Sequence, residues 1–288
     1  MEISLAEKAR IMLEKEWNGL TIADDYIFGR VFSEPLLCKK LIELLLNVKV
    51  KELSMPPEYQ KSFQAGINSR GVRFDVYTES EHGAFDIEIQ TTKQKDLPLR
   101  MRYYQSSMDT SLIKKGQRFS DLKQTYVLFI STVDQFGYGE PVYEIETCVK
   151  GHPEYNFNDK RKEVVYNITA FEKMEDSAKK SFLEYIATGE AKMDFEKELN
   201  NKVVEIKDDE YWKNNYINIQ MWKMDAIIEG EERGKTVGME AGIKQGIEEG
   251  LKEGLKKGRT LQKNEDEKII AQKDAEIAHL KELLAAKK

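Results

Sequence analysis

Histidine and cysteine are scarce in this chain, which limits the chemistry it can support. The 288 residues contain three histidines and two cysteines. His82, His152 and His279 provide little material for a histidine-rich zinc site or a Ser/His/Asp triad. Cys38 and Cys148 form no CxxC element, and so few cysteines are more typical of a reducing cytoplasm than of a disulfide scaffold.

Long apolar runs and phosphate-binding glycine motifs are also missing. No stretch approaches the roughly 20 apolar residues that span a membrane, and residues 1–19 are charged throughout, unlike a signal peptide. The glycines cluster towards the C-terminus with no strand pattern ahead of them, which argues against Walker-type and dinucleotide-binding loops. With 40% hydrophobic and 33% charged residues, the chain can bury one core and keep a charged appendage. We therefore expect a cytoplasmic protein that does not enter a membrane.

Two neighbouring segments alternate between apolar and polar residues and carry carboxylates in the same phase. Residues 72–77 place Asp75 on their polar side, and residues 85–90 place Glu88 and Gln90 there. The short polar stretch between the segments is typical of a turn that joins antiparallel strands. The pattern predicts a β-hairpin on which these three side chains converge as a metal-binding carboxylate site.

A solvated strand face remains the ordinary alternative, because wet strands produce such rows of carboxylates routinely. The sequence that follows favours a functional site. The segment from Glu88 to Arg118 holds seven basic residues against three acidic ones, in a chain whose net charge is −6. Carboxylates beside a basic segment suit a phosphate-bearing substrate held near a divalent cation. The basic residues are Lys93, Lys95, Arg100, Arg102, Lys114, Lys115 and Arg118.

Several short motifs follow one another between residues 22 and 134. In order they are Asp25-Tyr26-Ile27-Phe28 with Val31-Phe32, Arg73-Phe74-Asp75-Val76, Glu88-Ile89-Gln90, Arg100 ahead of Tyr103-Tyr104, and residues 116–122 before the apolar run 125–130. Their order and spacing resemble the PD-(D/E)XK nuclease superfamily, specifically its transposase-like Rpn branch of recombination-promoting nucleases. The resemblance implies an α/β fold, with a restriction-endonuclease-like mixed sheet core flanked by helices.

The resemblance also implies roles for individual residues. Asp75 and Glu88 fall on the two acidic positions of the family, and Asp25 matches the acidic residue of its leading helix. These residues would hold one or two Mg²⁺ or Mn²⁺ ions for the hydrolysis of DNA. Gln90 stands where the superfamily name has lysine, although this branch commonly carries glutamine there. An amide orients water but adds no charge, which Lys93 or Arg100 would then have to supply.

DNA contacts are predicted at Lys93, Arg100, Arg102 and Tyr104, on or just before a basic helix. Aromatic residues at helical spacing are more often part of a core, so a packing role is the alternative for the tyrosine.

The remaining pattern predicts the order of the elements. We expect helices at 5–15 and 25–46, the second capped by Thr21, and a short strand at 48–53 that ends before Pro56-Pro57. Further helices are expected at 98–115, from 177 to Gly189, at 193–206 and at 209–230, and further strands at 125–131 and 164–168. The predicted division is a nuclease-like core at 1–175, a helical extension at 176–229, a glycine repeat at 230–259 and a charged, coiled-coil-like tail at 260–288.

Glycine recurs at every fourth position from Gly230 to Gly258, and an apolar residue follows most of these glycines. Each glycine costs a helix about 1 kcal/mol relative to alanine. The repeat is therefore either a linker that frays between helix and coil or a surface on which two helices approach closely. A period of four drifts by about 40° per step against the helix, so any apolar stripe winds around it.

Beyond the glycine repeat, Ile270, Ile277 and Leu284 keep a seven-residue spacing that Lys273 interrupts, which suits a weak coiled coil or a solvated helix. We predict that the tail mediates homo-oligomerisation.

Two functions therefore remain open. The favoured one is a metal-dependent DNA endonuclease with a role, implied by the resemblance, in recombination, mobile elements or defence against foreign DNA. The alternative is a non-catalytic scaffold that acts through its oligomerising tail.

Overall fold

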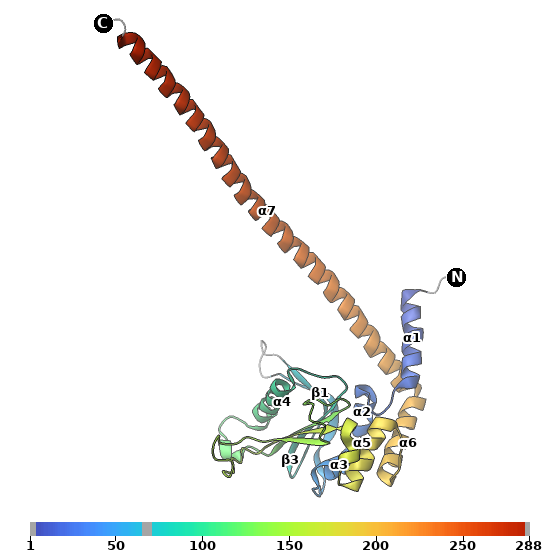
Figure 1. The fold of residues 1–288 in the computed structure, drawn as a ribbon. Coiled ribbons are helices and arrows are strands. Elements are labelled where there is room, and N and C mark those ends of the chain that lie inside the picture. The colour runs from blue at the N-terminus through green and yellow to red at the C-terminus, as the bar shows by residue number, and fades with distance from the viewer. Residues whose placement is uncertain (1–3, 65–70, 286–288) are drawn as a thin grey trace. The chain divides into compact units, whose positions relative to one another are not determined.

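A six-stranded mixed sheet organises the first part of the protein (Figure 1). The computed structural model describes residues 4–64 and 71–285, and the chain divides into two units, Met1–Gln220 and Met221–Lys288. The strands lie in the order β1-β2-β3-β4-β6-β5, with β3, β4 and β6 parallel and the other neighbours antiparallel. The sheet with its flanking helices confirms the predicted α/β, restriction-endonuclease-like class. The strands are β1 (Leu53–Phe63), β2 (Val72–Ser80), β3 (Gly83–Gln90), β4 (Thr125–Ser131), β5 (Val142–Ile145) and β6 (Arg161–Asn167).

The predicted hairpin is present as β2 and β3, with Val76 opposite Ile87 and Ser80 opposite Gly83. Gly83 has a φ of +138°, and a Cβ added there would lie 2.0 Å from the carbonyl oxygen of Gln124. Only glycine fits this position, because any side chain would collide with the backbone that precedes β4.

The strand ahead of the hairpin differs from the expectation. The prediction of a short strand at 48–53 was wrong, since β1 begins at Leu53 and runs through both Pro56 and Pro57. Its pairing with β2 shifts register between Leu53 and Met55 and again before Glu58. Prolines are tolerated here because β1 lies at the edge of the sheet and the irregular register removes the need for their N–H groups. Strand β5, at the opposite edge, was not predicted.

The predicted helix at 25–46 is in fact two helices, α2 (Asp25–Phe32) and α3 (Pro35–Leu46). Pro35 lacks an N–H group and forces extended geometry on Glu34, so α2 ends and a new helix begins with proline in its first turn. The predicted Thr21 cap was wrong as well. Asp24 holds the N-cap position, and its carboxylate accepts a hydrogen bond from the Thr21 N–H at 2.6 Å.

Helices cover both faces of the sheet. Helix α4 (Leu97–Leu112) packs its Met101 and Met108 against one face, together with Phe74 and Phe129 from the strands. Helices α2 and α3 contact the sheet through β1, β2 and β3, and the Tyr166 hydroxyl of β6 donates a hydrogen bond to the carbonyl of Leu45 at the end of α3. Arg100 of α4 contacts Glu88 and Gln90 near the C-terminal end of β3.

The remaining elements of the first unit are helical. They are the helices α1 (Leu5–Gly19), α5 (Ser177–Thr188) and α6 (Asp194–Asp208) and the 3₁₀ turns η1 (Phe119–Asp121) and η2 (Ile168–Lys173). Helix α5 ends before Gly189, as predicted, and Gly189 has a left-handed conformation. Helix α5 contacts α3, α6 and η2, and α6 contacts α2. These contacts tie the helices after residue 175 to the sheet layer, and the four-part division of the chain stays a prediction.

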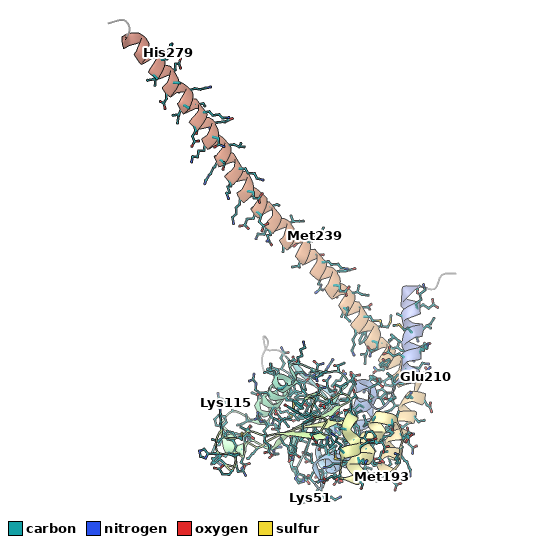
Figure 2. The ribbon with its side chains drawn as sticks, in the orientation of Figure 1. Lys51, Lys115, Met193, Glu210, Met239 and His279 are labelled. Atoms are coloured by element: carbon teal, nitrogen blue, oxygen red, sulfur yellow. The ribbon has the colours of Figure 1, made fainter. Side chains whose placement is uncertain are left out.

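Helix α7 (Glu210–Ala285) continues through the whole glycine repeat, well past the predicted end at residue 230. Among the described residues, nothing lies within 4 Å of a Cβ added at any glycine from Gly230 to Gly258. Ion pairs between side chains four residues apart, such as Glu248 with Lys252, each support the helix by about 0.2–0.5 kcal/mol, less than each glycine costs. Met239, labelled in Figure 2, is 71% exposed. The side chains of Leu280 and Leu284, part of the predicted heptad, lie outside the described residues.

Among the helices that the structure describes, none is both long enough and apolar enough to cross a membrane.

Candidate active site

Strand β3 carries the polar core of the site. Every residue of β3 is buried, including Asp86, Glu88 and Gln90, whose alternation places them on the same face. A solvated polar face was the alternative interpretation of this hairpin, and it does not apply to β3, whereas on β2 Arg73 is exposed and Asp75 is half-buried. Burying carboxylates is costly unless they are paired or bound to a cation, so their presence here calls for a chemical reason.

Asp75 and Glu88 hold each other across the two strands. The backbone N–H of Asp75 donates to Glu88 Oε1 at 2.9 Å, and the N–H of Ile89 donates to Asp75 Oδ2 at 3.1 Å. On the other side of β2, the register places Gln60 opposite Asp75, and Gln60 has a φ of +54°. A left-handed backbone in a non-glycine residue is strained, and such strain concentrates at functional sites. The two carboxylates are thus fixed by hydrogen bonds from the backbone of the neighbouring strand, next to a strained residue of β1.

Burial raises the pKa of both carboxyl groups. For Asp75 the pKa lies well above its usual range, first because of desolvation and then because of the neighbouring Glu88 carboxylate. For Glu88 the pKa is also raised by desolvation, which the Asp75 N–H, the Asp86 carboxyl and the Arg100 guanidinium only partly oppose. Because both carboxyl groups resist ionisation, a bound cation would strongly stabilise their charged forms.

Asp86 is a buried carboxyl that the sequence reasoning did not select. Its side chain is fully buried, and neither oxygen has a hydrogen-bond partner among the described residues. Desolvation and the nearby Glu88 carboxylate raise its pKa well above the usual range. Its phase was the available signal, since Asp86 alternates with Glu88 and Gln90 along β3.

The amide of Gln90 is held on both sides. Its Nε2 donates to the carbonyl oxygen and to the hydroxyl of Thr92, both at 3.0 Å. Its Oε1 accepts from Nη1 of Arg100 at 2.9 Å. The amide is therefore locked in position at the end of β3.

Arg100 reaches into this cluster from the first turn of α4. Its Nη2 lies 3.4 Å from Glu88 Oε2 and donates to the Tyr104 hydroxyl at 2.9 Å. Burial raises the pKa of Tyr104 to about 12, so its phenol stays neutral. Its ring lies edge-on to Phe74, with centroids 5.2 Å apart. The ring of Tyr104 therefore packs in the core, as the alternative interpretation expected, whereas its hydroxyl contacts Arg100 in the site.

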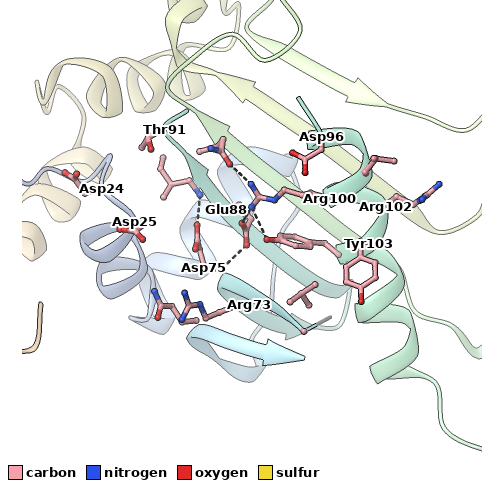
Figure 3. A pocket seen from close by; sticks show the side chains of 17 residues that line it. Asp24, Asp25, Arg73, Asp75, Glu88, Thr91, Asp96, Arg100, Arg102 and Tyr103 are labelled. Carbon is pink, nitrogen blue, oxygen red and sulfur yellow. Dashed lines mark hydrogen bonds and ion pairs between the residues drawn. The ribbon is translucent and has the colours of Figure 1, made fainter. Parts of the chain in front are cut away.

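An open cleft of about 730 Å³ borders the carboxylates (Figure 3). Lys93 is exposed ahead of α4 but is not among the described residues that line the cleft. The cleft is also lined by Asp24, Arg73 and Asp96, which the sequence reasoning did not select, although Arg73 shares the phase of Asp75. The predicted residues that line it are Asp25, Asp75, Glu88, Gln90, Arg100, Arg102 and Tyr104.

The donor set suits a hard divalent cation. Within the described residues, no three histidine, cysteine or acidic side chains are grouped closely enough to hold a metal by themselves. Mg²⁺ commonly takes only one or two protein carboxylates and completes its shell with water and substrate phosphate. Asp75 and Glu88 provide two neighbouring carboxylates, and Asp25 lines the same cleft and raises the pKa of Asp75 through its charge.

The mixed sheet and the Asp75–Glu88 pair on its β2–β3 hairpin define a nuclease-like fold of the restriction-endonuclease class. Residues 22–222 match the PD-(D/E)XK nuclease family transposases, and the chain belongs to this family. No curated protein and no solved structure matches the chain.

Proposed function

We propose that the protein is a DNA endonuclease that hydrolyses phosphodiester bonds with the help of Mg²⁺ or Mn²⁺. The observation that carries this proposal is the reciprocal fixing of Asp75 and Glu88 at the base of an arginine-lined cleft. Membership of the family supports nuclease chemistry, and the residues of this chain specify where it would take place.

Asp75 and Glu88 would hold the metal through their carboxylates, with Asp25 reaching it directly or through water. When bound, the ion would activate a water molecule and neutralise charge that develops on the phosphate oxygens. The oxygen of a water molecule held by Gln90 would attack phosphorus, the bond from phosphorus to the bridging oxygen would break, and the proton of the water would be released to solvent. The leaving oxygen takes up a proton from solvent.

Gln90 would orient the attacking water as an acceptor. Both N–H bonds of its amide are used by Thr92, whereas Oε1 keeps a lone pair after accepting from Arg100. A water that donates to this oxygen turns its own lone pair towards the phosphorus atom.

Arg102 and Lys93 are the proposed contacts to the phosphate backbone. Both side chains belong to exposed residues, Arg102 on the cleft and Lys93 just ahead of α4. Arg73 adds a further cation to the cleft wall. Exposed cations of this kind attract DNA without reading its sequence. Arg100 and Tyr104, also predicted as DNA contacts, lie deeper and face the carboxylates.

Cleavage of supercoiled plasmid with Mg²⁺, Mn²⁺ or EDTA tests the proposal. The parent should nick the plasmid only with metal, and Glu88→Gln, which keeps the oxygen that accepts from Asp75, should lose the activity. Glu52→Gln is the matched control, because Glu52 is exposed and does not line the cleft. Cutting by Glu88→Gln at the parental rate, or no cutting by the parent in any metal, would overturn the proposal.

The second candidate is a non-catalytic scaffold that acts through α7. It is favoured by the exposed apolar side chains of Met239, Ile243, Ile247, Leu251 and Leu255, each of them more than half exposed. In either function we propose that this stripe joins two copies of the chain. The full-length Ile247→Glu variant should then sediment at a lower mass than the parent. Assembly without any uptake of Mn²⁺ would favour the scaffold, and an unchanged mass would remove the homo-oligomer.

A cytoplasmic location is part of the same proposal, and the presence of two free cysteines, Cys38 and Cys148, supports it. A role in recombination, mobile elements or defence against foreign DNA rests on the resemblance to the Rpn branch.

A further inference from the structure

The sequence left two alternatives, Lys93 and Arg100, for the charge that is missing at position 90. Position 90 of this chain is glutamine, which carries no charge, yet a developing phosphate charge is best stabilised by a fixed cation close to it. Among the described residues, Arg100 is the basic side chain that bonds to Gln90 or Glu88.

We propose that Arg100 supplies from helix α4 the positive charge that a lysine would bring at position 90, and that it also fixes the orientation of the Gln90 amide. The proposal rests on the nuclease function proposed above.

The geometry gives Arg100 one partner for each task. One end of its guanidinium donates to Gln90 Oε1 at 2.9 Å, and the other lies 3.4 Å from Glu88 Oε2. The same nitrogen that faces Glu88 donates to the Tyr104 hydroxyl at 2.9 Å. A planar guanidinium with several fixed donors can serve three acceptors at once, which a lysine ammonium does less well.

Arg100 decides which way the Gln90 amide faces. A guanidinium has donors only, so the atom that meets it must be the amide oxygen. The Thr92 carbonyl has acceptors only, so the atom that meets it must be the amide nitrogen. The two contacts leave Oε1 pointing at the cation with one lone pair free. Without Arg100 the amide could turn over and would present a donor where an acceptor is needed.

The surroundings keep Arg100 charged and in place. Its guanidinium carbon lies 5.3 Å from the centroid of the Tyr104 ring and 5.7 Å from that of Phe129, within cation–π range. Burial by itself would lower the pKa of Arg100, but the Tyr104 hydroxyl and the carboxylates of Glu88 and Asp75 outweigh it and the pKa is raised. The charge is thus retained at the cleft, where a substrate phosphate would meet it.

A purely structural role is the competing explanation, in which Arg100 only balances the buried charge of Glu88. The two explanations differ when the charge is moved. If Arg100 acts through its charge and its hydrogen bond to residue 90, a lysine placed at position 90 should restore part of the kcat that is lost without Arg100. If Arg100 only supports the fold, that lysine should restore nothing.

The test compares Arg100→Met, Gln90→Lys and the double variant Gln90→Lys/Arg100→Met in the full chain. Arg100→Met should lower kcat by about 100-fold with a small change in KM, the size of loss seen when one transition-state donor is removed. The double variant should be at least about tenfold faster than Arg100→Met, a non-additivity that marks coupled residues. Arg10→Ala, on α1 and away from the cleft, is the matched arginine control. Unchanged kcat in Arg100→Met, or no recovery in the double variant, would overturn the proposal.

Metal binding gives a readout that does not require activity. Because the Arg100 cation repels a second cation at Glu88, Arg100→Met should bind Mn²⁺ at least about threefold more tightly by calorimetry. Equal affinity in the two proteins would count against the charge assignment even if the parent cuts DNA. Tighter binding in the variant, together with a parent that cuts nothing, would keep the charge assignment and reject the nuclease.

Discussion

Glu88 accepts a hydrogen bond from the backbone N–H of Asp75, the residue that would share its metal ion. The Asp75 carboxylate in turn accepts from the N–H of Ile89, directly after Glu88. Each carboxylate is therefore placed by the strand that carries the other. The geometry of the site therefore depends on the register of the hairpin, and a shift of even one residue would break both hydrogen bonds.

Neutralising the carboxylates should separate their structural role from their chemical one. Asp75→Asn keeps an oxygen that can accept from the Ile89 N–H, so we expect the variant to fold. It should lose Mn²⁺ binding and DNA cleavage together, because the amide carries no charge. Circular dichroism, calorimetry and plasmid nicking check the three properties. A variant that folds and still binds Mn²⁺ as the parent does would remove Asp75 from the metal site.

The raised pKa values of Asp75 and Glu88 predict a pH-dependent stability. A carboxyl whose pKa is higher in the folded state stabilises the protein fully below its unfolded pKa of about 4, and this contribution is lost as pH rises through the folded value. With EDTA, the melting temperature should therefore fall more steeply from pH 5 to pH 8 in the parent than in the variant Asp75→Asn/Glu88→Gln. Mn²⁺ should reduce the difference, because the cation replaces the protons. Parallel melting curves for the two proteins would contradict this account.

Gly29 should be sensitive to the smallest substitution. A Cβ at Gly29 would lie 1.9 Å from Cδ2 of Tyr59, so Gly29→Ala must displace this ring. Overpacking of this kind typically costs about 1–3 kcal/mol of unfolding free energy. Gly19→Ala is the control, since Gly19 is helical and nothing described lies within 4 Å of its added Cβ. Urea unfolding followed by circular dichroism should show a loss for the first variant and no loss for the second.

The glycine repeat allows its two interpretations to be tested against each other. Gly242→Ala/Gly246→Ala should raise the helicity of α7, because each change favours the helix by about 1 kcal/mol. If the glycines let two helices approach, the same variant should associate more weakly in sedimentation experiments. Lys244→Ala, about 200° around the helix from Gly242, should leave association unchanged. Stronger association of the glycine variant would show that close approach at these positions is not needed.

Predictions from the sequence were correct where the local pattern and the tertiary environment agree. Strand β4 was predicted at its observed residues, because a continuous apolar run of that length is typical of a strand buried on both faces. The phase of Asp75, Glu88 and Gln90 was also readable, since alternation along a strand is independent of what covers it. The extent of β1 was predicted wrongly because Pro56 and Pro57 suggested an end to the strand, and only the assembled sheet shows that β1 lies at an edge.

By itself, then, the sequence determined the hairpin, the residues that share its polar face and the basic helix that follows, because these depend on neighbours along the chain. The tertiary structure decided that the β3 part of this face, Asp86 included, is buried. It also decided that Arg100 turns towards Gln90 and Glu88, a contact between residues of a strand and a helix whose orientation no local pattern encodes. Burial and charge pairing depend on which surfaces meet, and that is settled only when the helix packs on the sheet.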